Sequence, residues 1–372
     1  MTKPKFAFFG MGNLGLAHAG HMALHGYDVS LCNRTGAKLQ LLIENNNEIR
    51  LGGILAEKAR LTLVTASYEE AIAGRDVIVI CTAAPGHKYT VTQLLPFLRP
   101  HHHIVLHPGY MLGAVEIHQL LTKHQLDRIP ISEIESSLFT CRYDGSVVHI
   151  KAMKKHLGFA TLPGHRNRES LSLFHPLYSQ YLRPYSNVME TGMLNLNFIN
   201  HPPIALLNAA VIDTGKRFLY YREGVTEHVA NLIEATDNER IAICHALGIQ
   251  TVSAHEWQQR HYPGLIGDDS TLCSTLKTNA AYHGVYSPDK LYSRFIWEDI
   301  PYGIIPVISI GSAIGVKTPS MDAIYGLCKA MFHADWSREA RTLDNLGLRG
   351  LNGRQLLRFM VIGNTQSIDS QE

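Results

Sequence analysis

The N-terminal segment that decides the fold reads Lys5-Phe-Ala-Phe-Phe-Gly-Met-Gly-Asn-Leu-Gly15. Its apolar first half is typical of a buried strand, and residues 14–25 have the composition of a helix. The sequence Gly-x-Gly-x-x-Gly therefore lies between a strand and a helix, which is the context of a dinucleotide-binding loop. In such a loop Gly10 permits the tight turn, Gly12 lets the backbone approach a pyrophosphate, and Gly15 lets helix and strand pack closely.

We expect a nicotinamide dinucleotide to contact two loops. The first loop offers the free N–H groups of a helix N-terminus to the phosphates. It consists of Gly10, Met11, Gly12, Asn13, Leu14 and Gly15.

The second loop follows the second predicted strand and consists of Asn33, Arg34 and Thr35. An acidic residue here would bind the ribose 2′-hydroxyl of NAD. This loop has none, and a guanidinium can bind a 2′-phosphate through two hydrogen bonds. The loop therefore favours NADP(H), with NAD(H) as the alternative. Arg34 also has a simpler interpretation as an exposed side chain at a helix start.

Predicted strands and helices alternate along the first half of the chain. The further strands are expected at residues 28–32, 61–65, 77–81 and 103–106, and the further helices at 37–44, 68–73, 90–98 and 113–124. Continuous apolar strands between amphipathic helices indicate a parallel sheet that is covered on both faces. We therefore predict an α/β fold that begins with a Rossmann-like, doubly wound parallel sheet.

Beyond about residue 190 the strand pattern disappears. Helical spacing recurs at residues 204–213, 226–247 and 320–332, separated by proline and glycine. A chain of 372 residues is long enough for two domains. We predict an NAD(P)-binding Rossmann-like domain over residues 1–188 and a mostly α-helical substrate and catalytic domain over residues 189–372.

Composition narrows the choice of partners and location. The chain has 34 Lys and Arg against 32 Asp and Glu, and these residues are dispersed, so we expect neither a nucleic-acid nor a membrane partner. Six cysteines without a C-x-x-C pair indicate reduced thiols and a cytoplasmic protein. The longest apolar run, around residues 304–316, is shorter than the roughly 18 residues that a membrane span needs.

Three consecutive histidines, residues 101–103, raise the question of a metal site. Consecutive residues of a strand point to opposite faces, so three adjacent rings do not converge on one ion. We predict a loop that leads into a strand, and no metal.

An apolar segment in the second half contains three charged residues. It reads Arg294-Phe-Ile-Trp-Glu-Asp-Ile-Pro-Tyr-Gly-Ile-Ile-Pro306. Buried charges are costly unless they are paired or used. His201, which precedes two prolines, offers a use: a carboxylate on one ring nitrogen leaves the other for proton transfer. Asp299 or Glu298 could be that carboxylate, and Arg294 could bind a substrate carboxylate. Alternatively, Arg294 and Asp299 form a buried ion pair that holds two helices together.

These residues resemble those of the opine dehydrogenases, the family that includes octopine and nopaline dehydrogenases. The resemblance runs over most of the chain. The matching blocks are the glycine loop, Pro108-Gly109-x-x-x-Gly113-Ala-x-Glu116, the segment around Glu133, Asn-x-x-x-His201-Pro, Glu223-Gly-Val-Thr and Arg294-x-x-x-Glu298-Asp299-x-Pro301-x-Gly303-x-x-Pro306.

The resemblance implies an oxidoreductase that acts on the CH–NH group of its substrates. The implied reaction is the NAD(P)H-dependent reductive condensation of an amino acid with an α-keto acid such as pyruvate, and the reverse oxidation. The product is a secondary amine, an N-(carboxyalkyl)amino acid. By the same resemblance, His201 is the acid/base, Asp299 its partner and Arg294 the ligand of the keto acid carboxylate. Glu133 is expected near the amino acid, and a homodimer is suggested by analogy.

Two alternatives stay open. An NADP-dependent keto or hydroxy acid dehydrogenase of the ketopantoate reductase type would share the first domain. It would rely on a lysine pair in the second domain, where Lys277 lacks the surrounding pattern. A non-catalytic NADP-binding regulator is the other alternative, and it would not need the histidine or the aspartate.

Overall fold

The computed structural model of the chain describes residues 3–34 and 36–364. The chain divides into two compact units. The first unit contains residues 3–109, 113–191 and 360–364, and the second contains residues 110–112 and 192–359.

The division into these two units is not a single boundary between residues 188 and 189, which is the boundary that the sequence predicts. The main break falls within helix α8 (Val188–Met193), between Thr191 and Gly192. In addition, the described chain from Met360 onward belongs to the first unit, where His118 donates a hydrogen bond from Nε2 to the carbonyl of Gly363 (2.6 Å). Contacts between residues so far apart leave no periodic pattern in the sequence.

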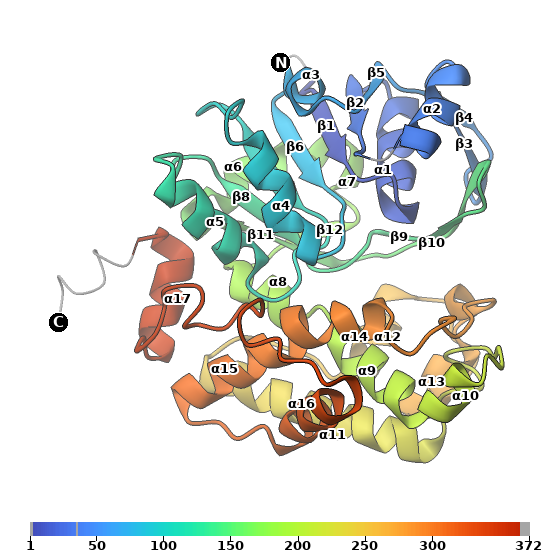
Figure 1. Cartoon of the computed structure of the whole chain (residues 1–372), viewed down its shortest axis with the longest axis vertical. Helices are drawn as coiled ribbons and strands as arrows, with labels where there is room; N and C mark the ends of the chain where they lie inside the picture. The colour runs from blue at the N-terminus through green and yellow to red at the C-terminus, as the bar shows by residue number, and fades with distance from the viewer. Residues whose placement is uncertain (1–2, 35, 365–372) are drawn as a thin grey trace. The chain divides into compact units, whose positions relative to one another are not determined.

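An eight-stranded sheet forms the centre of the first unit (Figure 1). Six parallel strands lie in the order β5-β2-β1-β6-β7-β8, which is the order of the doubly wound dinucleotide fold. Strand β11 pairs antiparallel with β8, and β12 pairs parallel with β11. The strands are β1 (Phe6–Phe9), β2 (Val29–Cys32), β5 (Leu63–Thr65), β6 (Val77–Ile80), β7 (His103–Leu106), β8 (Ile131–Ile134), β11 (Leu157–Leu162) and β12 (Leu182–Pro184). The predicted fold class is confirmed.

Helices cover both faces of this sheet because successive strand residues point to opposite sides. Phe6 packs against Phe174, next to α7 (His175–Tyr178), whereas Phe9 stacks on Tyr68 of α3 (Tyr68–Ile72). Helices α4 (Pro85–Leu94) and α5 (Gly113–Lys123) follow α3 on its face. The remaining elements are α1 (Asn13–Leu24), α2 (Gly36–Glu44), a 3₁₀ turn η1 (Gly164–Arg166) and α6 (Asn167–Ser172).

The helix predicted at residues 90–98 is shifted in the structure. Helix α4 begins at Pro85 and ends at Leu94. Proline fits the first turn of a helix, where its missing N–H is not needed, and Pro96 opposes continuation of the helix.

A second, four-stranded sheet was not predicted. Its order is β4-β3-β10-β9, with β3 (Glu48–Gly53), β4 (Lys58–Arg60), β9 (Phe139–Tyr143) and β10 (Val147–Met153). Buried and more exposed residues alternate along β10, as expected for a strand with one covered face. The covering helix is α1, where Gly20 leaves room for Ile49 and Leu51 of β3.

The second unit is helical around the central helix α11, which contacts four other helical elements. Its helices are α9 (Asn197–Leu207), α10 (Ala209–Asp213), α11 (Glu227–Ala246), α12 (Ala254–His261), α13 (Leu272–Thr278), η2 (Ala280–Tyr282), α14 (Arg294–Trp297), the π-helical turn η3 (Ile300–Ile304), α15 (Ile305–Ile314) and α16 (Pro319–Phe332); α17 (Gly353–Ile362) leads back to the first unit. Thr226 caps α11 by accepting the N–H of Val229. No helix in the described part of the chain is long and apolar enough to cross a membrane.

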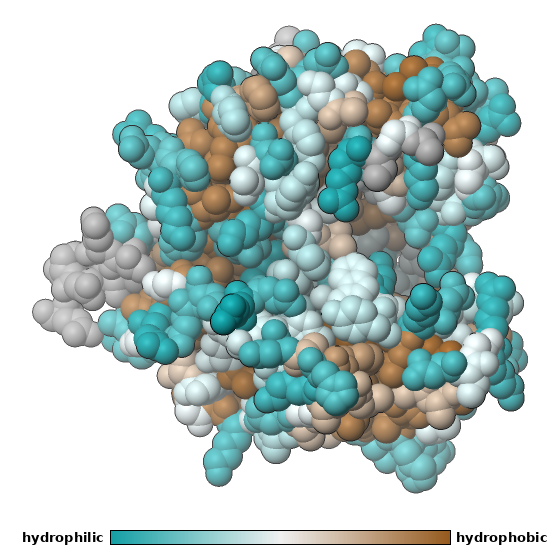
Figure 2. Space-filling model, in the orientation of Figure 1, coloured by the Kyte–Doolittle hydropathy of each residue, from teal (hydrophilic) through white to brown (hydrophobic). Residues whose placement is uncertain are grey.

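Polar side chains are spread over the face of the molecule that Figure 2 shows, with apolar areas among them. Two exposed apolar residues of the first unit, Leu41 and Ile43, lie on α2. More than half of an ordinary protein surface is apolar, so this area by itself indicates no partner.

Candidate active site

The glycine loop after β1 has the geometry that a bound pyrophosphate needs. Gly10 has a positive φ of 108°, which favours glycine. A Cβ on Gly15 would overlap the carbonyl oxygen of Gly10, so only glycine lets α1 start this close to the strand. At Gly12, by contrast, no described atom lies within 4 Å of an added Cβ, so the backbone is open to an approaching phosphate.

The N-terminus of α1 keeps its N–H groups available for an anion. Its N-cap is Gly12, no described side chain caps it, and no acidic residue lies in its first turn. The side chain of Asn13 accepts the N–H of Tyr143 (2.8 Å), while Leu14 packs against the core. Met11 is buried, and its N–H donates to the side chain of Asn33 (3.4 Å). These residues therefore offer a ligand their backbone rather than their side chains.

The second predicted loop contains an exposed cation. The Arg34 guanidinium lies over the ring of Tyr89 on α4, 5.7 Å from its centroid. Asn33 connects this loop to the glycine loop through Met11. Thr35 lies outside the described residues. The arrangement places a guanidinium and an aromatic face beside the end of β2, where the adenosine half of a dinucleotide binds in this fold.

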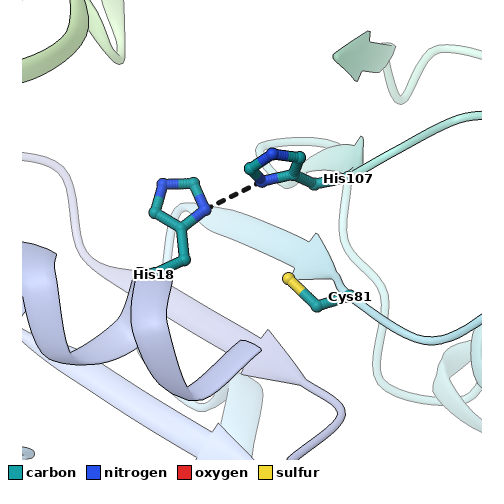
Figure 3. A group of neighbouring side chains, drawn as sticks. All are labelled: His18, Cys81 and His107. Carbon is teal, nitrogen blue, oxygen red and sulfur yellow. Dashed lines mark hydrogen bonds between the residues drawn. The ribbon is translucent and has the colours of Figure 1, made fainter. Parts of the chain in front are cut away.

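A buried group of His18, Cys81 and His107 lies in the first unit, where Cys81 is next to Gly10 and Gly15 of the glycine loop (Figure 3). The two Nδ1 atoms of the histidines are 2.9 Å apart, and the ligand atoms of all three residues lie within 4.8 Å of one another. Such a spacing raises the question of a metal ion.

The hydrogen bonds of the group oppose a metal. His107 Nε2 accepts the N–H of Leu138 (3.1 Å), so its Nδ1 carries the proton and donates it to Nδ1 of His18. The two Nδ1 atoms are then hydrogen-bonded to each other. Coordination of a metal by Nδ1 of His107 would require the loss of its proton, which would leave an imidazolate. We assign the group to packing and hydrogen bonding between α1 and the ends of β6 and β7.

Two of the three consecutive histidines, His102 and His103, have separate hydrogen-bond partners. Nδ1 of His102 accepts the N–H of Arg99 (2.9 Å), and Nε2 of His103 is 2.7 Å from the hydroxyl of Ser132. These rings are held in different hydrogen bonds, and the segment leads into β7.

In the second unit, His201 and Asp299 form a buried pair. Nδ1 of His201 lies 2.8 Å from Oδ2 of Asp299, and the carboxylate is completely buried. A carboxylate only accepts hydrogen bonds, so Nδ1 carries the proton and Nε2 has the free electron pair. The structure thus selects Asp299 over Glu298 as the partner of this histidine.

His201 lies in α9 directly before Pro202 and Pro203. Each proline removes a helical N–H donor and crowds the preceding turn, at a cost of about 3 kcal/mol in a helix interior. A helix that retains two such residues is held by its packing, since every residue from Phe198 to Leu206 is buried.

Asp299 precedes the π-helical turn η3, whose wider backbone ring joins the N–H of Ile304 to the carbonyl of Asp299 (2.9 Å). Such turns are rare and occur frequently at functional sites. Gly303 of this turn touches α9: an added Cβ would overlap the Cβ of Phe198, one turn before His201. Glycine here lets the elements that carry His201 and Asp299 come together.

Replacing Gly303 with alanine should therefore separate α9 from η3. We expect the free energy of unfolding to fall by about 1–3 kcal/mol, the usual cost of overpacking, and turnover to fall with it. Urea unfolding and steady-state kinetics measure the two effects. Gly326→Ala is the matched control, because Gly326 lies in α16 with no described atom within 4 Å of an added Cβ. Equal behaviour of the two variants would contradict this role of Gly303.

Arg294 starts α14 and has two polar partners on the same nitrogen. Its Nη2 lies 3.2 Å from Oε2 of Glu298 and donates to the Tyr110 hydroxyl (3.0 Å). The Arg294 side chain is still 54% exposed, whereas Glu298 is buried. The guanidinium is therefore anchored at one end and keeps donors for a ligand. The alternative of a buried Arg294–Asp299 pair does not fit these partners.

Tyr110 was not singled out from the sequence, although it lies in the Pro108-Gly109 block. It has a left-handed backbone with φ of 60°, which is costly for an aromatic residue and is common at functional sites. Burial, followed by the Glu298 carboxylate, raises the pKa of its hydroxyl well above the ordinary value. The next residue, Met111, is tied to η3 by its N–H, which donates to the carbonyl of Tyr302 (3.1 Å).

Tyr221 was also missed. Its hydroxyl lies 2.9 Å from Nε2 of His201, so it completes a chain from Asp299 through the imidazole. The only signal in the sequence was its position just before the Glu223-Gly-Val-Thr block.

Glu133 has a different environment from the expected one. It is completely buried, and its carboxylate accepts the N–H of Ala114 in the first turn of α5 and the hydroxyl of Thr191. A carboxylate at a helix N-terminus satisfies free donors and complements the helix dipole. We assign Glu133 a role in the stabilisation of α5, and its expected position near the amino acid stays a prediction.

Comparisons with known proteins cover both halves of the chain. A model of the alpha-helical domain of NAD/NADP octopine/nopaline dehydrogenase matches residues 184–332, and one of the NAD binding domain of 6-phosphogluconate dehydrogenase matches residues 5–129. Opine dehydrogenase of Arthrobacter sp. (strain 1C) is 33% identical over 347 residues, which are 93% of this chain and 96% of that protein. Vitopine synthase of Allorhizobium ampelinum is 25% identical over 94% of this chain and 96% of its own length.

Solved structures agree on the fold. Octopine dehydrogenase with NADH and L-arginine has a TM-score of 0.79 at 20% identity and covers 97% of this chain and 98% of its own. Yersinopine dehydrogenase with bound NADP+ has a TM-score of 0.73 at 14% identity and covers 99% of both chains. A ketopantoate reductase from Ralstonia eutropha JMP134 has a TM-score of 0.59 at 15% identity, covering 88% of this chain and 98% of its own.

Proposed function

Because this chain belongs to the opine dehydrogenase family, we propose that it condenses an amino acid with an α-keto acid such as pyruvate and reduces the product to a secondary amine, using NAD(P)H. The reverse oxidation is the same reaction run backwards. The observation that carries the proposal is the buried His201–Asp299 pair (2.8 Å), in which the carboxylate holds one imidazole nitrogen and the other nitrogen, bonded to the Tyr221 hydroxyl, takes part in proton transfer.

Arg294 would bind the carboxylate of the keto acid. Tyr110 and Glu298 both contact Nη2, so they fix the plane of the guanidinium and leave its other N–H groups for a bidentate carboxylate. A planar fork of this kind sets the orientation of the bound acid as well as its affinity, which is what a reaction at C2 requires.

His201 would move the protons of the condensation. When the amine has added to the keto group, the hydroxyl of the resulting carbinolamine must leave as water, and it leaves only with a proton. Protonated His201 supplies that proton, and the Asp299 carboxylate stabilises the imidazolium. In the oxidation, neutral His201 accepts a proton during the addition of water. The bound nicotinamide supplies or accepts the hydride.

We propose that NADP(H) is the preferred cofactor, on the support of Arg34 and the lack of an acidic side chain between Asn33 and Lys38. Arg34→Ala should raise the KM for NADPH about 10- to 100-fold, because a hydrogen bond to a charged group contributes about 1.5–3 kcal/mol. The KM for NADH should stay the same. Arg60→Ala, an exposed arginine on β4, is the control. An equal rise in the KM for NADPH and for NADH would show that Arg34 does not bind the 2′-phosphate.

A single assay tests the function. Oxidation of NADPH is followed with pyruvate, with and without a pool of the standard amino acids, and NADH is run in parallel. Oxidation that needs both pyruvate and an amine is the expected result, and dividing the pool then identifies the amino acid. Oxidation with pyruvate alone would make the enzyme a keto acid reductase instead.

We also propose a cytoplasmic location and a homodimer. All six cysteines are free in the structure, which supports a reducing compartment. The homodimer rests on family analogy, and sedimentation of the purified protein would test it.

A further inference from the structure

Both ring nitrogens of His201 are occupied. Nδ1 donates to Asp299 (2.8 Å), and Nε2 lies 2.9 Å from the Tyr221 hydroxyl. The electron pair on Nε2 accepts one hydrogen bond in the plane of the ring, so Tyr221 is its donor. While this bond persists, no substrate atom can bind directly to the nitrogen that the proposed chemistry uses.

Tyr221 is held firmly in this position. Its ring stacks on Tyr282 with centroids 4.2 Å apart and an angle of 19°, and it meets Tyr220 edge-on at 5.3 Å. The Tyr282 hydroxyl in turn donates to Oε1 of Gln258 (2.9 Å), which also accepts from Asn279 (3.3 Å). Tyr221 is buried as well. A side chain packed in this way does not swing aside easily, so the hydrogen bond to His201 is a fixed part of the site.

We infer that the Tyr221 hydroxyl relays protons between His201 and the substrates, an inference that rests on the proposed function. During dehydration, the Nε2–H proton of the imidazolium passes to the Tyr221 oxygen. The hydroxyl proton of Tyr221 passes at the same time to the carbinolamine oxygen, whose bond to carbon breaks. Water leaves, the nitrogen electron pair forms the C=N bond, and both His201 and Tyr221 end neutral. Oxidation runs the same transfers in reverse.

Tyr220 provides a matched comparison. It is buried beside Tyr221, and its hydroxyl donates to the backbone carbonyl of His201 (2.7 Å) rather than to the ring. Removing either hydroxyl deletes one hydrogen bond to the same residue, but only Tyr221 lies on a path for protons. A merely structural role would therefore give similar results at both positions.

The test compares wild type, Tyr221→Phe and Tyr220→Phe in the amine-dependent assay. Tyr221→Phe should lower kcat about 10- to 100-fold with the KM for NADPH unchanged. This loss is smaller than that for the acid/base itself, because without the hydroxyl Nε2 of His201 can donate its single proton directly to the carbinolamine oxygen. The second measurement is kcat in mixtures of light and heavy water, plotted against the fraction of heavy water. For the wild type this plot should be curved, since two protons move together. For Tyr221→Phe it should be a straight line, since one proton moves. Tyr220→Phe should keep the curve and most of its kcat.

Each outcome has a distinct meaning. The relay would be overturned if Tyr221→Phe kept the kcat of the wild type. It would also be overturned if both variants lost the same factor in kcat and kept the curved plot. Either result would leave the proposed function intact. A wild type without amine-dependent turnover would overturn the proposed function, and the relay with it. Titration of NADPH fluorescence and thermal melting verify that both variants fold and bind cofactor, so a loss of kcat reports on the reaction.

Discussion

Replacing His201 with asparagine should lower kcat by about 10²- to 10⁴-fold while NADPH binds as before. General acid–base catalysis contributes an effect of this size, and His201 is the buried imidazole that Asp299 holds in one tautomer. The cofactor contacts that we propose lie in the first unit, whereas His201 belongs to the second. Cofactor affinity is therefore expected to stay constant, and the rate of NADPH oxidation with pyruvate and the amino acid measures the loss.

Asp299→Asn tests the partner of the pair. An amide preserves the size of the side chain, but it removes the charge that stabilises the imidazolium, so kcat should fall again. Because both residues act as a unit, the double variant should lose little more than the worse single variant. The control is His118→Asn, a buried histidine of the first unit that bonds to the Gly363 carbonyl. A His201→Asn enzyme with wild-type kcat would end the assignment of an acid/base role.

Lowering the pH from about 6.5 to 5 should destabilise the first unit by several kcal/mol. Six buried histidines in the described part of this unit have a lowered pKa, and we consider the three with the strongest shifts: His18, His103 and His107. Burial lowers the pKa of His103 to about 3, with a smaller contribution from Arg166. Burial, then Lys154, lowers the pKa of His107 to about 3, and burial, then His107, lowers the pKa of His18 well below its ordinary value.

Acid lowers the stability because these rings take up protons near pH 6.5 in the unfolded chain. Below that pH the unfolded state binds protons that the folded state cannot, so the stability present above pH 6.5 is lost as the pH falls toward about 3. Each histidine contributes about 1.4 kcal/mol per pH unit, and three together contribute about 4. Over 1.5 pH units this approaches the whole stability of a typical domain, about 5–15 kcal/mol.

Urea unfolding of the protein between pH 7 and 5 measures this effect. His103→Gln should reduce the slope of the unfolding free energy against pH by about 1.4 kcal/mol per pH unit, although it also costs the hydrogen bond to Ser132. His124→Gln, an exposed position just after α5, is the control. A stability that stays flat over this range would show that the buried rings take up protons without unfolding.

The sequence by itself determined the features whose causes are local. The turn at Gly10, the open backbone at Gly12 and the close approach at Gly15 are steric demands within one short segment, and they could be stated without coordinates. The alternation of strands and helices and the helical second half follow from hydrophobic periodicity, which is also local. The charged residues of an apolar segment made His201, Arg294 and Asp299 candidates, and the resemblance to known family blocks assigned their roles.

Only the tertiary structure decided which of these residues meet. Asp299 and Glu298 are adjacent in sequence, yet one bonds to His201 and the other to Arg294, because the π-helical turn and the α9 packing at Gly303 direct them differently. Tyr221 reaches the imidazole through an aromatic stack assembled from distant segments. Such contacts join residues far apart along the chain and depend on the packing of whole elements, a cooperative property that no local pattern encodes.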